Sequence, residues 1–169
     1  MAKVFLSLGS NMGDRGYNLQ QALLGLERWG AKVVRVSSIY ETEPVGLKEQ
    51  PMFYNMVAQV ETELSPADLW KAIFAIEQSL KRERTVQGGP RTIDIDMLFY
   101  DDLVLQLEDE ETADDIRTML IIPHARLHER RFVLVPLAEI APQLVHPVFK
   151  KTVDELLKEC ADPAIVKPL

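Results

Sequence analysis

The sequence predicts an α+β fold, in which helices pack against an antiparallel sheet. Four short segments have the apolar runs or the two-residue alternation typical of strands. Two further segments carry apolar residues at helical spacing. The order in which these six segments follow one another then selects among the possible sheet architectures.

The chain begins with a strand and a helix. Residues 4–8 form an apolar run that stops at the turn signal Gly9-Ser10-Asn11, which predicts the first strand. We expect a helix next, and Gly30 stands where its C-terminal cap belongs. The apolar face of this helix consists of Leu19, Ala22, Leu23 and Leu26.

Two more strands follow, separated by a loop. Residues 33–36 form the second strand, and residues 53–62 form the third. Between them, residues 41–51 contain two prolines and a glycine without periodicity, so we expect a loop there.

A second helix and a fourth strand complete the pattern. Ser65 offers a capping hydroxyl, Pro66 suits the first helical position, and Asp68 suits the first turn. This helix is expected to end near Arg82, with an apolar face of Leu69, Ile73, Ile76 and Leu80. After a loop, residues 93–99 alternate as a strand does.

The resulting order, βαββαβ, is that of the ferredoxin-like split βαβ unit, an antiparallel sheet with helices on one face. The part that begins at Pro123 is rich in helix formers and in prolines, so we expect a C-terminal helical extension. There is no internal repeat and no linker, and residues 1–169 are expected to form a single domain.

Composition and charge exclude several classes of protein. With 47% apolar and 27% charged residues and a single cysteine, Cys160, the chain is neither disordered nor stapled by an internal disulfide. No signal peptide and no membrane-spanning run is present, so we expect a cytoplasmic protein without a membrane partner. The net charge of −7 is local, because residues 101–115 hold eight acids and no base. We expect no nucleic-acid partner, since the predicted strands are mostly apolar or acidic.

The most informative local pattern is the acid pair in the fourth strand. A period of two places Asp94 and Asp96 on the same face, with their Cα atoms roughly 7 Å apart. Mg²⁺ prefers oxygen ligands and is commonly bound by one or two carboxylates together with substrate phosphates. The alternative is an ordinary solvated sheet face, although aspartate is depleted from strands.

Basic residues lie on both sides of this strand. Arg82, Arg84 and Arg91 precede it, and arginines beside carboxylate-held Mg²⁺ suit phosphoryl transfer. A basic helix end that complements the helix dipole is the alternative for Arg82. After Pro123, Arg126 and Arg130 lie four residues apart and are expected to face one way.

Other candidates are better explained by structure. The glycine-rich segment 9–16 has neither the G-x-G-x-x-G spacing nor the G-K-[ST] of a P-loop, and a tight strand-to-helix turn explains it. His128 and His146 are expected to be structural, and no Cys/His metal spacing is present.

Five sequence blocks in order resemble the 6-hydroxymethyl-7,8-dihydropterin pyrophosphokinases of folate synthesis. The blocks are LGSNMGDR (8–15), SSIYETEPVG (37–46), QPMFYNMVAQVET (50–62), GPRTIDIDMLFYD (89–101) and IPHARLHERRFVLVPLAEIAP (122–142). The resemblance implies transfer of pyrophosphate from ATP to the hydroxymethyl group of the pterin, with release of AMP. It also implies two Mg²⁺ ions held by Asp94 and Asp96.

The resemblance further assigns the substrate contacts. Its catalytic set is Arg82, Arg91, Asp94 and Asp96. Its ATP-binding set is Glu77, Arg82, Arg84, Arg91, Met97, His124 and Arg130. Its pterin-binding set is Thr42, Glu43, Val45, Phe53, Asn55, Asp94 and Phe132. Gly88 and Ala125 stand where some members carry an aromatic residue.

Alternative functions remain open from the sequence. A ferredoxin-like module that senses a ligand is one, and a two-metal nucleotidyltransferase or phosphohydrolase is another. We expect small-molecule substrates, a monomer with a dimer as the alternative, and closure of loops 41–51 and 84–91 over the ligands.

Overall fold

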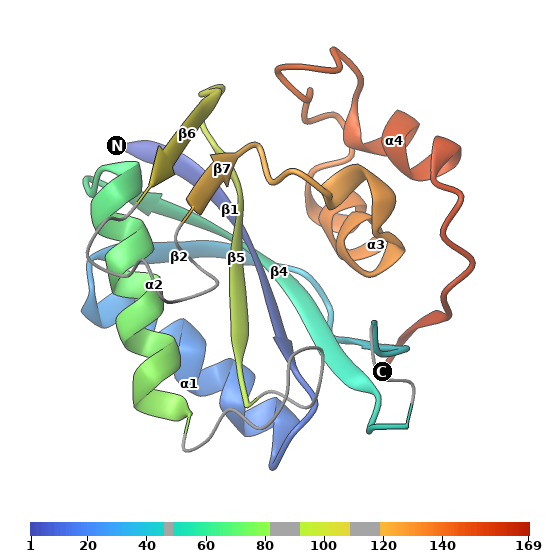
Figure 1. Cartoon of the computed structure of the whole chain (residues 1–169), viewed down its shortest axis with the longest axis horizontal. Helices are drawn as coiled ribbons and strands as arrows, with labels where there is room; N and C mark the ends of the chain where they lie inside the picture. Colours follow the sequence, from blue (N-terminus) through green and yellow to red (C-terminus); the bar gives the residue numbers. More distant parts are fainter. Residues whose placement is uncertain (46–48, 82–91, 109–118) are drawn as a thin grey trace.

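The computed structural model describes residues 1–45, 49–81, 92–108 and 119–169. Within these residues, six strands form one sheet in the order β5-β1-β4-β3-β8, and β2 pairs with the far end of β4 (Figure 1). The strands are β1 (Ala2–Ser10), β2 (Ala31–Val36), β3 (Tyr40–Thr42), β4 (Phe53–Thr62), β5 (Asp94–Tyr100) and β8 (Val166–Pro168). Every pairing between neighbouring strands is antiparallel, so the predicted α+β sheet is confirmed.

Helices α1 (Arg15–Arg28) and α2 (Pro66–Leu80) cover one face of the sheet. Strand β1 sends Val4, Leu6 and Leu8 to this face, because side chains alternate along a strand. They join a core built from both helices and from β4 and β5. The helices start as the sequence indicates: the Ser65 hydroxyl accepts a hydrogen bond from the Asp68 N–H at the start of α2, and Gly30 follows α1 with a φ of 93°.

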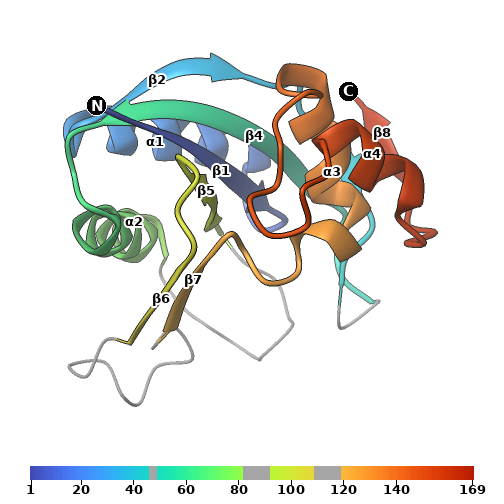
Figure 2. The same ribbon diagram turned by 90° about the horizontal axis from the view of Figure 1, so that it is seen from above.

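The opposite face carries a second helical layer, which corrects the expectation of helices on one face. This layer consists of α3 (Arg131–Ile140) and α4 (Val153–Glu159), preceded by the short 3₁₀ helix η2 (Leu127–Glu129). Phe5 of β1 and Val57 of β4 bury their side chains against it. Figures 1 and 2 both show α3 and α4 on the other side of β1 and β5 from α2. This layer packs on the part of the face that carries Phe5, Val57, Leu98 and Phe99.

Strand β5 contains a bulge that increases its contact with the second layer. The register with β1 shifts between Phe5, which faces Phe99, and Leu6, which faces Met97. Leu98 is the additional residue, and both Leu98 and Phe99 are buried with α3 and α4. Before the bulge the alternation is regular, so the predicted common face of Asp94 and Asp96 is retained.

Several element boundaries differ from the predictions. β1 continues through Gly9 and Ser10, which were expected in a turn, because both residues pair with β4. The expected loop 41–51 begins inside β3, where Glu41 and Thr42 pair with β4. The acidic segment contributes β6 (Leu105–Glu108), which forms a hairpin sheet with β7 (Met119–Ile122). The C-terminal extension is helical as expected, but it ends in strand β8.

The second layer should contribute a large part of the free energy of unfolding. Leu134 of α3 is completely buried between the sheet and α4, so Leu134→Ala should lower this free energy by about 2–5 kcal/mol. Urea denaturation followed by circular dichroism measures the change. Leu24→Ala on the exposed side of α1 is the matched control and should cost less than about 1 kcal/mol. Equal losses for the two variants would contradict this account of the packing.

Candidate active site

Three neighbouring strands place a row of residues across the end of the sheet at which β1 ends and β4 and β5 begin. Gly9 of β1 lies opposite Asp94 of β5 on one side and opposite Asn55 of β4 on the other. Residues directly opposite each other in antiparallel strands project to the same face. The Cα atoms of Asp94 and Asn55 are two strand spacings apart, roughly 10 Å. Because Gly9 has no side chain, no side chain of β1 stands between the carboxylate and the amide, and we call this part of the sheet face the hollow.

The Asn55 amide occupies the space that a larger residue at position 9 would take. A Cβ atom on Gly9 would lie 2.4 Å from Oδ1 of Asn55 and 3.5 Å from the Phe53 ring. Asn55 is buried, and its Nδ2 donates a 2.6 Å hydrogen bond to the hydroxyl of Thr42 on β3. The hollow is therefore walled by an oriented amide and an aromatic ring, a combination that suits a flat polar heterocycle.

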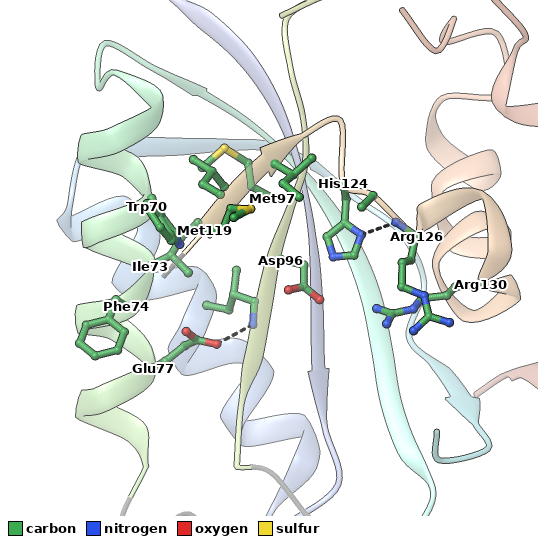
Figure 3. Close-up of a pocket in the computed structure, with 14 residues that line it drawn as sticks. Trp70, Ile73, Phe74, Glu77, Asp96, Met97, Met119, His124, Arg126 and Arg130 are labelled. Carbon is green, nitrogen blue, oxygen red and sulfur yellow. Dashed lines mark hydrogen bonds between the residues drawn. The ribbon is translucent and has the colours of Figure 1, made fainter. Parts of the chain in front are cut away.

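A cavity of about 350 Å³ opens at the edge of the sheet beside this row. It lies between α2, the edge strand β5, β7 and the segment that follows β7 (Figure 3). Its walls are apolar and aromatic on the α2 side and basic on the opposite side. The lining side chains include Trp70, Ile73, Phe74, Glu77, Asp96, Met97, Met119, His124, Arg126 and Arg130.

The acid pair connects the hollow with the cavity. Asp94 stands in the row with Gly9, and Asp96 lines the cavity one pleat further along β5. In Figure 3 the Asp96 carboxylate lies between Glu77 on one side and His124 and Arg130 on the other. A ligand in the hollow and a ligand in the cavity would both meet the same pair of carboxylates.

Glu77 holds the edge strand in place from helix α2. Its side chain is fully buried, and its Oε2 accepts a 2.9 Å hydrogen bond from the backbone N–H of Ile95. Ile95 lies between the two aspartates, in a strand whose other edge is paired with β1. The carboxylate of Glu77 therefore supports the backbone from which Asp94 and Asp96 project.

His124 is a neutral hydrogen-bond donor at the cavity wall. Burial, with a contribution from the Arg130 charge, lowers the pKa of His124 from 6.5 to about 4, although Asp94 opposes the shift. Its Nδ1 accepts a 3.2 Å hydrogen bond from the backbone N–H of Arg126, so the ring proton belongs on Nε2. Figure 3 shows this second nitrogen on the side of the ring away from Arg126.

The donor chemistry at the acid pair fits a magnesium ion shared with a phosphate ligand. Asp94 and Asp96 supply carboxylate oxygens on one face of a rigid strand, which are the ligands that Mg²⁺ prefers. Among the residues with described positions, no group of three or more potential metal-ligating side chains occurs. Two carboxylates match an ion completed by substrate oxygens better than one enclosed by protein ligands alone.

The structure brings the predicted residues together in two groups. Four residues of the ATP-binding set line the cavity, namely Glu77, Met97, His124 and Arg130, and Asp96 of the metal pair lines it with them. Thr42, Phe53 and Asn55 of the pterin-binding set surround the hollow with Asp94.

Some of the remaining predicted residues lie elsewhere in the described structure, and the others lie outside the described residues. Phe132 lies at the start of α3 below Arg130, whose guanidinium carbon is 5.8 Å from the centre of its ring. Glu43 and Val45 follow β3, and Val45 is 55% exposed. Arg82, Arg84, Gly88 and Arg91 lie outside the described residues.

Sequence reasoning missed the aromatic wall of the cavity and the role of Gly9. Trp70 and Phe74 lie four apart on α2, beside the face that periodicity assigned to the core. Together with Glu77 they follow helical spacing, and this was the available signal. Gly9 was read as a turn residue, whereas its pairing with both β4 and β5 places it at the centre of the site.

Comparisons with known proteins find matches over most of the chain. A family model described as 7,8-dihydro-6-hydroxymethylpterin-pyrophosphokinase (HPPK) matches residues 5–142. The 2-amino-4-hydroxy-6-hydroxymethyldihydropteridine pyrophosphokinase of Bacillus subtilis is 45% identical over 141 residues, which cover 83% of this chain and 78% of that protein. The protein of the same name from Haemophilus influenzae is 37% identical and is covered to 98%.

Longer proteins also match. The folic acid synthesis protein fol1 of Schizosaccharomyces pombe is 41% identical over 95% of this chain, and the chain spans only 21% of its length. The crystal structure of wild-type Plasmodium falciparum HPPK-DHPS with STZ-DHP aligns with a TM-score of 0.76 at 19% identity, over 94% of this chain and 43% of that one. This likeness shows a shared fold.

None of the described helices is both long enough and apolar enough to span a membrane.

The family model covers most of the chain, and a relative with 45% identity is matched over most of its own length. The chain therefore belongs to the 7,8-dihydro-6-hydroxymethylpterin-pyrophosphokinase family.

Proposed function

We propose that the protein transfers pyrophosphate from ATP to the hydroxymethyl group of 6-hydroxymethyl-7,8-dihydropterin, giving AMP and the pterin diphosphate for tetrahydrofolate synthesis. Membership of the family supports the reaction, and ATP is the co-substrate that the family implies. The observation that carries the proposal is the position of the acid pair: Asp94 lies in the row that contains Gly9 and Asn55, and Asp96 lines the cavity of about 350 Å³. Transfer between two bound substrates requires such a junction.

The nucleotide belongs in the cavity beside α2. Trp70, Phe74 and Met97 offer an apolar wall for a purine base, and Arg126 and Arg130 offer positive charge for phosphates. The neutral His124 can donate one hydrogen bond from Nε2 without adding charge. The predicted contacts of Arg82, Arg84 and Arg91 with the triphosphate remain part of the proposal.

The pterin belongs in the hollow above Gly9. Asn55 would read its hydrogen-bonding edge, Phe53 and Phe132 would enclose the ring, and the backbone near Thr42 would complete recognition. The support is that Asn55 is buried and already oriented by its hydrogen bond to Thr42. Orientation before binding reduces the entropy cost of recognition.

Asp94 and Asp96 would hold Mg²⁺, and two ions are proposed. When bound, the metal neutralises phosphate charge and orients the reacting oxygens. The protein's own contribution is to fix both carboxylates on one strand, which Glu77 supports through the Ile95 N–H. Glu77 thus acts on the site through the backbone of β5, in addition to lining the cavity.

We further propose that residues 1–169 act as one domain, as a monomer in the cytoplasm. The substrates implied by the family are small molecules, and both candidate sites are built on a single copy of the chain. Size-exclusion chromatography with light scattering measures the oligomeric state directly.

Removing either carboxylate of the pair should abolish transfer. Asp94→Asn and Asp96→Asn should each lower kcat by more than about 100-fold, because charge stabilisation at the reacting phosphate would be lost. An assay with ATP, Mg²⁺ and the hydroxymethyl dihydropterin, scored for AMP and diphosphorylated pterin, measures the effect. Asp101→Asn is the matched control, since Asp101 follows β5 and its carboxylate accepts a hydrogen bond from the Lys3 N–H. Transfer that persists in Asp94→Asn, or products other than AMP, would refute the proposed reaction.

Filling the hollow at Gly9 should impair pterin binding selectively. In Gly9→Ala the new methyl group displaces the Asn55 amide, so the Kd for the pterin should rise more than about tenfold, the loss expected for an unpaired polar contact. Isothermal titration calorimetry gives the Kd values for the pterin and for a non-hydrolysable ATP analogue, and the latter should change little. In the control Gly16→Ala, the nearest atom to the new Cβ is 4.0 Å away. Unchanged pterin affinity in Gly9→Ala would show that the hollow is not the pterin site.

The low pKa of His124 has a measurable consequence for ligand-free protein. Between pH 6.5 and about 4 the unfolded chain binds a proton at His124 that the folded protein does not bind. This residue therefore contributes no pH dependence to stability above pH 6.5, and it lowers the free energy of unfolding as pH falls towards 4. NMR of the imidazole nitrogens should show a neutral ring with the proton on Nε2 at pH 5.5. A titration midpoint near 6.5 would contradict the assignment.

A further inference from the structure

The segment that follows α4 contacts two elements that border the site, the start of α3 and strand β3. We call residues 161–169 the C-terminal strap; they lie beyond the stretch matched by the family model. Figure 1 shows this segment running from α4 to the edge of the sheet, where β8 lies. One of its ends contacts the beginning of α3, and the other pairs with β3.

At its first contact the strap caps helix α3. Asp162 accepts a 3.0 Å hydrogen bond from the backbone N–H of Arg131 through Oδ2 and another from Ala164 through Oδ1. Helix α3 has no acid in its first turn and no side-chain hydrogen bond from its own N-cap residue, Arg130. Asp162 therefore supplies, from a distant part of the chain, the cap and the negative charge that stabilise a helix N-terminus. Arg130 and Phe132 are fixed at this same turn.

At its second contact the strap holds β3 through Glu43. The Glu43 carboxylate accepts a hydrogen bond from the Ile165 N–H at 2.5 Å, and the Glu43 N–H donates to the Ile165 carbonyl at 3.3 Å. The pairing continues as β8, in which Val166 faces Thr42 and Pro168 faces Tyr40. A hydrogen bond to a charged acceptor is roughly twice as strong as a neutral one.

Strand β3 lies between the strap and the hollow. It has only three residues, and its other edge pairs with β4, where Thr42 lies opposite Phe53. The Thr42 hydroxyl is the acceptor that orients Asn55. A three-residue strand paired on one side alone is weakly held, so β8 and Glu43 supply the second set of backbone contacts that fixes Thr42.

We propose that the C-terminal strap is a positioning element of the active site, and that Glu43 acts through it. The carboxylate of Glu43 fixes Ile165, β8 and β3, and thereby the Thr42–Asn55 pair, without touching the pterin. The resemblance assigns the backbone around Thr42 and Glu43 to pterin recognition, and the proposal adds this separate role for the Glu43 side chain. The proposal rests on the pterin site proposed above.

The test compares three single variants with a control in the intact chain. Glu43→Ala should raise KM and Kd for the pterin about tenfold, the loss expected for a hydrogen bond to a charged group, while kcat at saturating pterin changes less than about twofold. The Kd for a non-hydrolysable ATP analogue should stay within about twofold. Glu43→Gln keeps an acceptor for the Ile165 N–H and should recover most of the pterin affinity. Asp162→Ala should weaken both ligands by up to about fivefold, because loss of a cap frees the α3 turn that carries Arg130 and Phe132.

Glu159→Ala is the control, since Glu159 lies at the end of α4 and forms an ion pair with Lys151. Hydrogen–deuterium exchange of residues 40–43 in ligand-free protein should accelerate at least about threefold in Glu43→Ala, as local opening becomes easier, and stay unchanged in Glu159→Ala. Unchanged exchange and unchanged pterin affinity in Glu43→Ala overturn the proposal. Equal loss in the alanine and glutamine variants also overturns it, because it indicates direct contact with the pterin. If the wild-type protein releases no AMP, the proposed reaction fails, and exchange alone decides whether the strap positions β3.

Discussion

The pairing of β1 with both β4 and β5 is the constraint on which the rest of the site depends. It sets Asp94, Gly9 and Asn55 in one row, and it sets Asp96 and Ser7 in the next. A shift of one residue in the β1–β5 register would turn the acids towards the core formed with α1 and α2, and a shift in the β1–β4 register would turn Asn55 there. The apolar side chains of β1 that are buried with these helices prevent such a shift, so core packing fixes the geometry of the chemistry.

The extent of the second helical layer decides where the site can be. Helices α3 and α4 bury Phe5, Val57, Leu98 and Phe99, and the bulge in β5 adds one apolar residue to that contact. The layer ends before the row that contains Gly9, and its first turn carries Arg130 towards the cavity. Glu139 ties the other end of α3 to the sheet by accepting hydrogen bonds from Ser38 and Tyr40. Burial raises the pKa of Tyr40 to about 12, and the hydrogen bond to Glu139 adds to the shift. The same helix thus closes the core and borders the site.

The sequence predicted the sheet, its two covering helices and the acid pair because each depends on local periodicity or spacing. It did not predict β8 or the hairpin β6–β7, since short strands acquire their partners only from tertiary contacts. The role of Gly9 was missed for a related reason: a strand glycine becomes informative only when both neighbouring strands are known. Trp70 was hidden because one helix carries both a core face and a cavity face, and periodicity identifies the more apolar one.

Local charge explains how an acidic protein accommodates a polyanion. The cavity wall opposite α2 carries Arg126 and Arg130, and burial beside them keeps His124 neutral, so this wall does not accumulate a third positive charge when ligand is absent. The buried Glu77 carboxylate accepts a hydrogen bond from the Ile95 N–H. A metal ion bound by the carboxylates of β5 would offset their negative charge and attract phosphate oxygens. Of the eight acids in residues 101–115, Asp101 and Asp102 follow β5 and Glu108 ends β6, and the other five lie outside the described residues, so their number says little about the potential inside the site. The net charge of the protein does not set the potential inside the cavity, because water and salt screen exposed charges. Strong electrostatic interactions with a bound ligand come from the few buried groups that line the cavity.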